Sequence, residues 1–282
     1  MAVMAGLVTG PNGRMATAPI SAVVRAVSRA RSWLSARHSL RAELLVVVGL
    51  YVLYESTRGI VAGRGTVAVQ HAYDVVSIER SLHLFVEASV ERSAERLSGL
   101  TSTLEVLYLS LHLVLTGLLL LWLHQRRPSA YPFFRTTLLL ASGVALIGYL
   151  VFPTAPPRLS ITSLDPSLSG VPLNINRGLV SGLYNPYAAV PSMHAAYALV
   201  VGAALFLQVS NWGIRLLGLA YPVFVVLVIV ATGNHFLFDV GVGAFVDVLA
   251  AAGAAFLLRG IPRRAANSPA LRVATIADRT AL

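Results

Sequence analysis

Six long apolar runs constrain what this sequence of 282 residues can fold into. They cover residues 44–62, 100–123, 133–152, 191–209, 214–232 and 236–258. A helix needs about 20 mostly apolar residues to cross the hydrocarbon core of a bilayer, and each run meets that requirement closely. We therefore predict an all-α integral membrane bundle of six transmembrane helices.

The composition excludes the other broad classes of chain. Charged residues make up 12% of the sequence, about half of the share that is usual in soluble domains. So few charges cannot cover a surface that faces water, and a hydrophobic content of 56% is too high for a disordered chain. Cysteine is absent, which excludes disulfides, thiolate metal sites and a cysteine nucleophile.

The net charge of +10 comes from 22 basic residues, all of them Arg, against 12 acidic residues. In a soluble protein this excess would suggest a nucleic-acid partner, but in a membrane protein Arg clusters mark cytoplasmic loops. With both termini inside, 15 of the 22 Arg residues lie on the inner side. We therefore predict a multi-pass plasma-membrane protein with cytoplasmic termini and no nucleic-acid partner.

Three parts of the chain follow from this topology. Residues 1–40 form a basic cytoplasmic segment, residues 41–259 form the six-span membrane domain, and residues 260–282 form a flexible cytoplasmic tail. The outer segment 63–99 is expected to form amphipathic helices on the membrane, with its acidic residues opposite the apolar face. That apolar face is expected to comprise Ile78, Leu82, Phe85 and Val86.

Ionisable residues gather where these spans meet the outer surface. Arg158 follows the third span, His194 lies at the start of the fourth, and His235 lies at the start of the sixth. Asp239 is four residues after His235 and so shares its helix face. Two His, one Asp and one Arg suffice for phosphoryl transfer: one imidazole attacks phosphorus, the other protonates the leaving oxygen, and Arg binds the remaining oxygens.

Two motifs resemble those of the type-2 phosphatidic acid phosphatase superfamily, also called lipid phosphate phosphatases. The fourth span opens with Pro-Ser-Met-His at 191–194, and the sixth carries His-x-x-x-Asp at 235–239. Arg158 in a Pro-Pro-Arg run, the Asn234-His235 pair and the segment 78–87 resemble the branch that contains inositol phosphorylceramide synthases. The resemblance covers roughly residues 40–258, and paired motifs are more specific than either alone.

The resemblance implies a role for each residue. It makes His235 the nucleophile, Asp239 the acid that orients it, and His194 the general acid, while Arg158 and Ser192 bind phosphate and no metal or cofactor takes part. The sequence departs from the superfamily pattern where a Lys and a Ser-Arg pair are usual. Phosphate binding then depends chiefly on Arg158, and the further candidates for it are Arg177, Tyr187, Asn234 and Arg80.

We therefore expect a metal-independent membrane lipid phosphatase or phosphotransferase, similar to an inositolphosphotransferase, that uses a phosphohistidine at the extracytoplasmic face. Its substrate would be a lipid phosphate or phospholipid, and a lipid alcohol or a polyol would be the acceptor in a transfer. The alternatives are a membrane transporter and a non-catalytic membrane protein of the same fold. His112, in the middle of the second span, is expected to be a packed polar residue.

Overall fold

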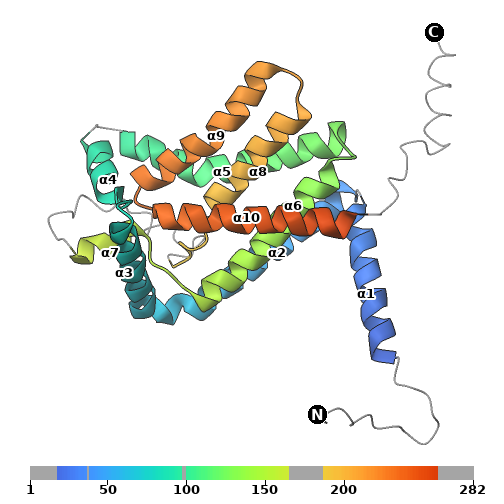
Figure 1. Ribbon diagram of the computed structural model, residues 1–282, viewed down its shortest axis with the longest axis horizontal. Helices are drawn as coiled ribbons and strands as arrows, with labels where there is room; N and C mark the ends of the chain where they lie inside the picture. Colours follow the sequence, from blue (N-terminus) through green and yellow to red (C-terminus); the bar gives the residue numbers. More distant parts are fainter. Residues whose placement is uncertain (1–17, 37, 97–99, 165–186, 260–282) are drawn as a thin grey trace, which may run out of the picture. The chain divides into compact units, whose positions relative to one another are not determined.

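A computed structural model describes residues 18–36, 38–96, 100–164 and 187–259 of the chain. Every regular element in these ranges is a helix (Figure 1). The chain divides into two compact units, Met1–Ala36 with Leu257–Leu282, and Arg37–Phe256. The first contains the exposed helix α1, and the second contains every candidate site residue named above.

The helices follow the hydropathy pattern closely. Their bounds are α1 Ala18–Ser35, α2 Leu40–Val61, the 3-10 turn η1 Ala62–Arg64, α3 Gly65–Ser81, α4 Glu87–Glu95, α5 Leu100–Arg126, α6 Tyr131–Val151, α7 Pro157–Leu164, α8 Met193–Gln208, α9 Trp212–Ala231 and α10 Leu237–Leu258. Each of the six predicted spans corresponds to one helix, with ends that differ by a few residues. Such differences reflect local caps, as where the Ser192 side chain accepts a hydrogen bond from the Ala195 N–H and starts α8.

Four helices in the described residues are long and apolar enough to cross a membrane, which identifies the chain as an integral membrane protein. They are Thr103–Arg126 within α5, Tyr131–Val151, Trp212–Ala231 and Leu237–Leu258. The other two predicted spans correspond to α2, with 22 residues, and α8, with 16 residues. At a rise of 1.5 Å per residue α8 is about 24 Å long, shorter than a typical hydrocarbon core. The count of six spans stays a prediction.

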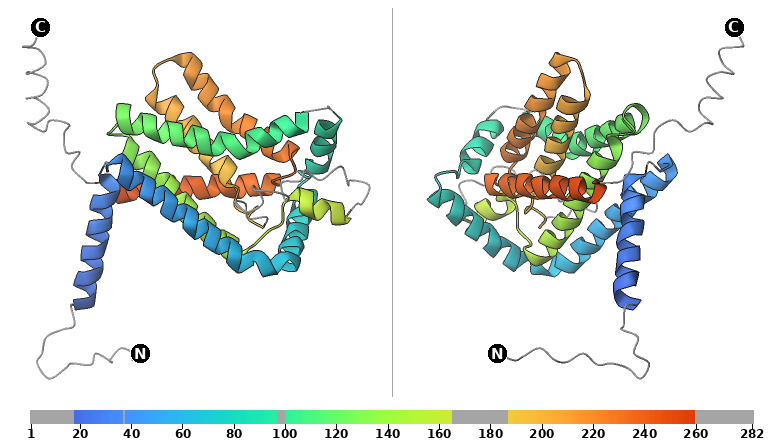
Figure 2. Two further views of the ribbon diagram at one scale, coloured as in Figure 1. Left: turned by 180° about the vertical axis from the view of Figure 1, so that it is seen from behind. Right: turned by 45° about the vertical axis from the view of Figure 1, so that its right-hand side comes forward.

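Close packing of α8 and α9 forms the centre of the membrane unit. The two helices make an antiparallel pair, and α5 crosses them and packs against both (Figures 1 and 2). Gly202 allows the close approach, since a Cβ atom there would lie 2.5 Å from the Gly218 carbonyl oxygen. On another side of the unit α2 and α6 run side by side. The candidate site lies where α8 and α10 begin.

Residues 63–95 form helices in large part, as predicted for the segment 63–99, but the burial of their acidic side chains differs from the prediction. Ile78 and Leu82 are exposed, whereas the carboxylates of Glu79 and Glu87 are buried. Acidic residues opposite the apolar face of a helix on the membrane would face water, and this part of the prediction is wrong for these two. The two carboxylates can be buried because both accept hydrogen bonds from backbone N–H groups at the start of α10.

The two ends of the predicted loop 153–190 lie together. Thr154 N–H donates to the Tyr187 carbonyl at 2.9 Å, and Ala189 N–H donates to the Thr154 carbonyl at 3.2 Å. A further bond from Ala155 N–H to the Ala68 carbonyl, at 3.0 Å, attaches this bridge to α3. The bridge fixes the backbone of Ala189 beside the start of α10, where it becomes part of the candidate site.

Candidate active site

His235 lies in the turn just before α10, and the residue is buried, with 3% of its surface exposed. Its Nδ1 atom is 3.1 Å from the Ala189 carbonyl oxygen and 3.3 Å from Asp239 Oδ2. Both neighbours are acceptors, so Nδ1 carries the hydrogen in the neutral ring. Nε2 therefore keeps its lone pair and is the atom able to act as a nucleophile.

Asp239 is fully buried in the first turn of α10. Its Oδ2 atom accepts a hydrogen bond from Phe236 N–H at 2.9 Å in addition to its contact with His235. The backbone bond fixes the carboxylate, and the carboxylate in turn fixes the ring, which is the arrangement that keeps an imidazole in one tautomer. The sequence spacing predicted this pair.

His194 lies in the first turn of α8 and faces His235, with the two ring centroids 5.5 Å apart. Tyr108 of α5 stacks on the His194 ring, with centroids 4.2 Å apart and planes inclined by 20°. The Nε2 atom of His194 is buried and has no hydrogen-bond partner among the described residues. No group of the described residues therefore competes for a hydrogen bond with this atom.

The starts of α8 and α10 are joined directly, which sets the spacing of the two histidines. Ser192 N–H donates to the Asp239 carbonyl oxygen at 3.1 Å. Gly243 of α10 lies against the backbone of Ser192, so closely that a Cβ atom there would collide with the Ser192 carbonyl oxygen. Tyr149 of α6 supports this junction from the other side, since its hydroxyl donates to the Pro191 carbonyl at 3.1 Å.

Arg158 is held against the turn that carries His235. Its backbone N–H donates to the Gly233 carbonyl at 2.9 Å, and its Nε donates to Asn234 Oδ1 at 2.8 Å. The Asn234 amide nitrogen donates to the Thr232 hydroxyl at 2.8 Å. Asn234 thus binds Arg158 on one side and the end of α9 on the other, so its side chain fixes the guanidinium beside the site.

A family model described as the PAP2 superfamily matches residues 73–253, well over half of the chain. The chain belongs to the PAP2 superfamily. The match includes both helix starts described above and the buried acidic residues of α3 and α4. No curated protein matches the chain, and no solved structure matches it.

Membership in the PAP2 superfamily confirms the resemblance at the level of the superfamily and indicates phosphatase or phosphotransferase chemistry on lipid-like phosphate esters. The match does not separate the branches of the superfamily, so a likeness to inositol phosphorylceramide synthases stays a prediction. Within the described residues, no three His, Asp or Glu side chains are grouped so that they could share a metal ion.

Two other predicted ligands have contacts with residues other than the PAP2 histidines, and a third lies outside the described residues. The Tyr187 hydroxyl lies against Gly65, where a Cβ atom would be 2.7 Å from it. Arg80 lies over the Phe85 ring, 5.1 Å from its centroid. Arg177 lies outside the described residues.

His112 was predicted to be a packed polar residue, but its contact with the His194 ring was not predicted. The His112 ring lies 3.9 Å from the His194 ring, and its Nδ1 is 3.3 Å from the Tyr108 carbonyl oxygen. Tyr108, His112 and His194 therefore form one cluster of rings beside His235. The four-residue spacing of Tyr108 and His112 on one helix was the signal that could have paired them.

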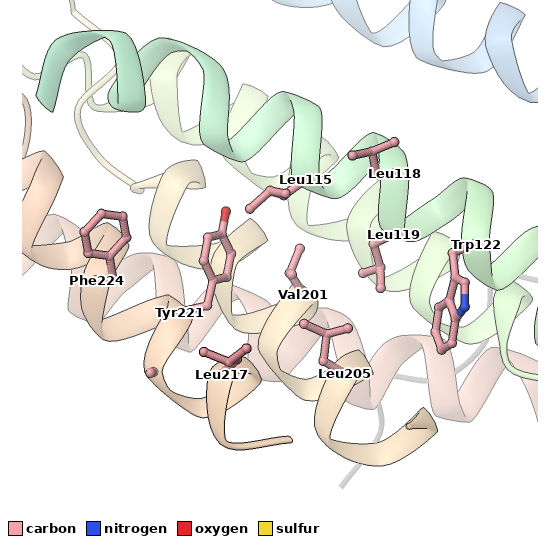
Figure 3. A pocket seen from close by; sticks show the side chains of 10 residues that line it. Leu115, Leu118, Leu119, Trp122, Val201, Leu205, Leu217, Tyr221 and Phe224 are labelled. Carbon is pink, nitrogen blue, oxygen red and sulfur yellow. The ribbon is translucent and has the colours of Figure 1, made fainter. Parts of the chain in front are cut away.

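An apolar groove in this PAP2 chain has a volume of about 590 Å³ and opens between α5, α8 and α9 (Figure 3). Leucine side chains and Trp122 of α5 face Val201 of α8 and Tyr221 of α9 across it. The groove is lined by Leu115, Leu118, Leu119, Trp122, Val201, Leu205, Leu217, Ala220, Tyr221 and Phe224. It continues the faces of α5 and α8 that hold His112 and His194, because Leu115 and Val201 follow them at helical spacing.

Proposed function

We propose that the protein is a membrane lipid phosphatase or phosphotransferase that acts through a phosphohistidine intermediate. The observation that carries this proposal is the arrangement of the two imidazoles. His235 donates from Nδ1 to two acceptors and so presents a lone pair on Nε2, and His194 lies 5.5 Å away, centroid to centroid, with an unengaged Nε2. These are the two atoms that a double displacement at phosphorus requires.

In the first half-reaction, His235 Nε2 attacks the phosphorus of the lipid. An N–P bond forms, the P–O bond to the leaving group breaks, and protonated His194 gives its Nε2 proton to the departing oxygen. Asp239, which contacts His235 Nδ1, stabilises the positive charge that develops on the phosphorylated ring. His194 is then neutral and has become a base.

In the second half-reaction, His194 removes a proton from water or from an acceptor alcohol. The resulting oxygen attacks phosphorus, the N–P bond breaks, and its electron pair returns to His235 Nε2. Both histidines recover their starting protonation states, and the steps use only residues of this chain. We propose accordingly that the reaction needs no metal and no cofactor.

Phosphate binding is proposed for Arg158, Ser192 and the first turn of α8. The guanidinium of Arg158, fixed by Asn234, supplies the positive charge. Ser192 accepts a bond from Ala195 N–H at 3.4 Å, which leaves its hydroxyl hydrogen available to donate. Backbone N–H groups at a helix start favour an anion, and His194 lies in that same turn. Arg177, Tyr187 and Asn234 stay predicted ligands.

The groove favours a lipid as the substrate over a soluble phosphate ester. From His112 to Trp122 the helix rises about 15 Å, which equals half of a typical hydrocarbon core and therefore the thickness of one leaflet. An acyl chain attached to a phosphate beside His194 can lie along α5 over that length. We place the site at the extracytoplasmic face, with both termini in the cytoplasm, because the Arg distribution favours that orientation.

The acceptor decides between a phosphatase and a phosphotransferase. Water as the acceptor releases inorganic phosphate, whereas a lipid alcohol or a polyol gives a new phospholipid. We favour a transferase similar to the inositol phosphorylceramide synthase branch, because the Pro-Pro-Arg run at 156–158 and the Asn-His pair at 234–235 resemble that branch.

The test is to incubate the purified protein with phospholipids that carry a ³²P label, with and without inositol and a lipid alcohol. The expected result is a phosphoenzyme that is stable to alkali and labile to acid, followed by transfer of the label. Glu and Asp esters have the opposite stability, so they provide the contrast. His235→Ala should abolish the phosphoenzyme, and full labelling of that variant would overturn the mechanism. Release of inorganic phosphate alone would assign the hydrolase reaction.

A further inference from the structure

Two buried carboxylates near the site have no part in the proposed chemistry. Glu79, in the last turn of α3, is 1% exposed, and Glu87, the first residue of α4, is fully buried. Only the short turn 82–86 separates the two helices. Buried Glu side chains are rare unless a partner compensates for their lost hydration, so their contacts are informative.

Both carboxylates bind the start of α10. Glu79 Oε1 accepts a hydrogen bond from Phe238 N–H at 2.6 Å, and Glu87 Oε1 accepts one from Leu237 N–H at 2.8 Å. Asp239 Oδ2 accepts from the preceding Phe236 N–H at 2.9 Å. Three consecutive N–H groups, which a helix start leaves without internal partners, are thus satisfied by three carboxylates from three helices.

The turn is also fixed by packing. Phe236 is fully buried in a cluster that includes Ala68, Ala72 and Val75 of α3. The residues on either side of it, His235 and Leu237, are each held by a hydrogen bond to a carboxylate. Movement of α3 and α4 relative to α10 would therefore displace the His235 ring.

Glu79 differs from an ordinary Glu in holding its proton at neutral pH. Burial is the main cause that raises the pKa of Glu79 to about 8, the neighbouring Glu87 and Asp239 contribute to the rise, and the bond from Phe238 N–H opposes it. The titratable groups that act on Glu79 are Glu87 from α4 and Asp239 from α10, and both raise its pKa. A proton on Glu79 removes one negative charge and so allows the acids to lie close together.

We propose that Glu79 and Glu87 are positioning residues, which hold the first turn of α10 and thereby fix His235 and Asp239 in the geometry that phosphoryl transfer requires. This inference rests on the proposed function. Neither carboxylate is a ligand of the substrate: each acts through the backbone of α10. Their loss should therefore lower kcat more than it raises KM.

The first experiment compares Glu79→Ala with Glu79→Gln, and uses Asp74→Asn, an exposed carboxylate on the same helix, as the matched control. We expect Glu79→Ala to lower kcat about 100-fold, since a displacement of about 1 Å has that effect on catalysis. Glu79→Gln is uncharged and keeps an oxygen that can accept from Phe238 N–H, so it should recover most of the rate at pH 6. Asp74→Asn should leave the rate unchanged.

The second readout is the pH profile, which a merely structural role would not move. In the native protein kcat should fall as the pH rises through about 8, because ionisation of Glu79 places two negative charges side by side. Glu79→Gln should lack that fall. An identical alkaline loss in the native protein and in Glu79→Gln would overturn the proposal, as would an unchanged kcat in Glu79→Ala.

Hydrogen–deuterium exchange separates this inference from the proposed function. Peptides that cover residues 235–240 should exchange faster in Glu79→Ala than in the native protein, whether or not the protein transfers phosphate. If the native protein forms no phosphoenzyme, the proposed function fails, while faster exchange in Glu79→Ala still supports the positioning role of Glu79. If exchange at 235–240 is the same in Glu79→Ala as in the native protein while the native protein is active, only the proposed positioning role fails.

Discussion

Asp239→Asn tests how the chain orients its proposed nucleophile. The substitution keeps the size of the side chain and an oxygen that can accept from Phe236 N–H, but it removes the negative charge beside His235 Nδ1. The backbone at the start of α10 should therefore keep its place. The change in rate then reports the effect of the charge on the imidazole.

The expected magnitude follows from the two acceptors of Nδ1. A hydrogen bond to a charged group contributes about 1–2 kcal/mol more than a neutral one, and each 1.36 kcal/mol changes a rate tenfold. The loss of charge should thus lower kcat about 5- to 30-fold. The Ala189 carbonyl, 3.1 Å from Nδ1, still accepts the hydrogen and preserves the tautomer. The loss should therefore be far smaller than the roughly 10⁴-fold loss that follows a change of tautomer in Ser-His-Asp hydrolases.

The assay is the single-turnover rate of phosphoenzyme formation with excess protein, which isolates the step that His235 performs. Asp247→Asn is the matched control, because it removes the other carboxylate of α10, two helical turns away, and should leave this rate unchanged. A loss of 10⁴-fold in Asp239→Asn would show that Ala189 does not hold the tautomer. A loss below threefold would show that Asp239 does not act on His235, and either result refutes the reasoning.

Three other perturbations test the packing, the substrate and the acid pair. Gly243→Ala should separate α10 from Ser192 and destabilise the protein by about 1–3 kcal/mol, seen as a lower thermal midpoint in detergent together with lost activity; an unchanged midpoint would contradict the close contact. Leu115→Trp should lower kcat/KM for long-chain substrates about tenfold while short-chain substrates are spared, and the exposed Leu113→Trp should not. The native protein should lose up to about 5 kcal/mol of stability between pH 4.5 and 8, because folded Glu79 holds its proton more tightly than the unfolded chain; calorimetry across that range should show no such slope in Glu79→Gln.

The apolar runs and the helical spacing predicted much of the fold and the core of the site. Apolar length alone located the helices, because a membrane span imposes a requirement on the sequence that hardly depends on its neighbours. The four-residue spacing of His235 and Asp239 likewise predicted their contact, although His235 lies in the turn just before α10 and only Asp239 lies in the helix. Both inferences concern local geometry, for which the sequence is sufficient.

The rest of the site depends on contacts between distant segments, which local patterns do not contain. The hydrophobic periodicity predicted that Glu79 and Glu87 face water, since an acidic residue on an amphipathic helix ordinarily faces solvent. Their partners are backbone N–H groups of α10, about 150 residues further along the chain. The Ala189 carbonyl is equally invisible in a sequence, because every residue type carries one. Asn234 was predicted as a phosphate ligand, and only the folded chain reveals its bond to Arg158.

The two helix starts at the site differ in a way that assigns them different tasks. A helix N-terminus attracts anions, but at α10 that attraction is already met by Asp239, Glu79 and Glu87. At α8 the Ser192 side chain binds Ala195 N–H and brings no charge. A phosphate therefore has reason to bind at α8, on the side of the general acid, while α10 presents the nucleophile. The N–P bond would then form across the junction of the two helices. This is why the short contacts that join α8 and α10 should control the rate as strictly as the two histidines do.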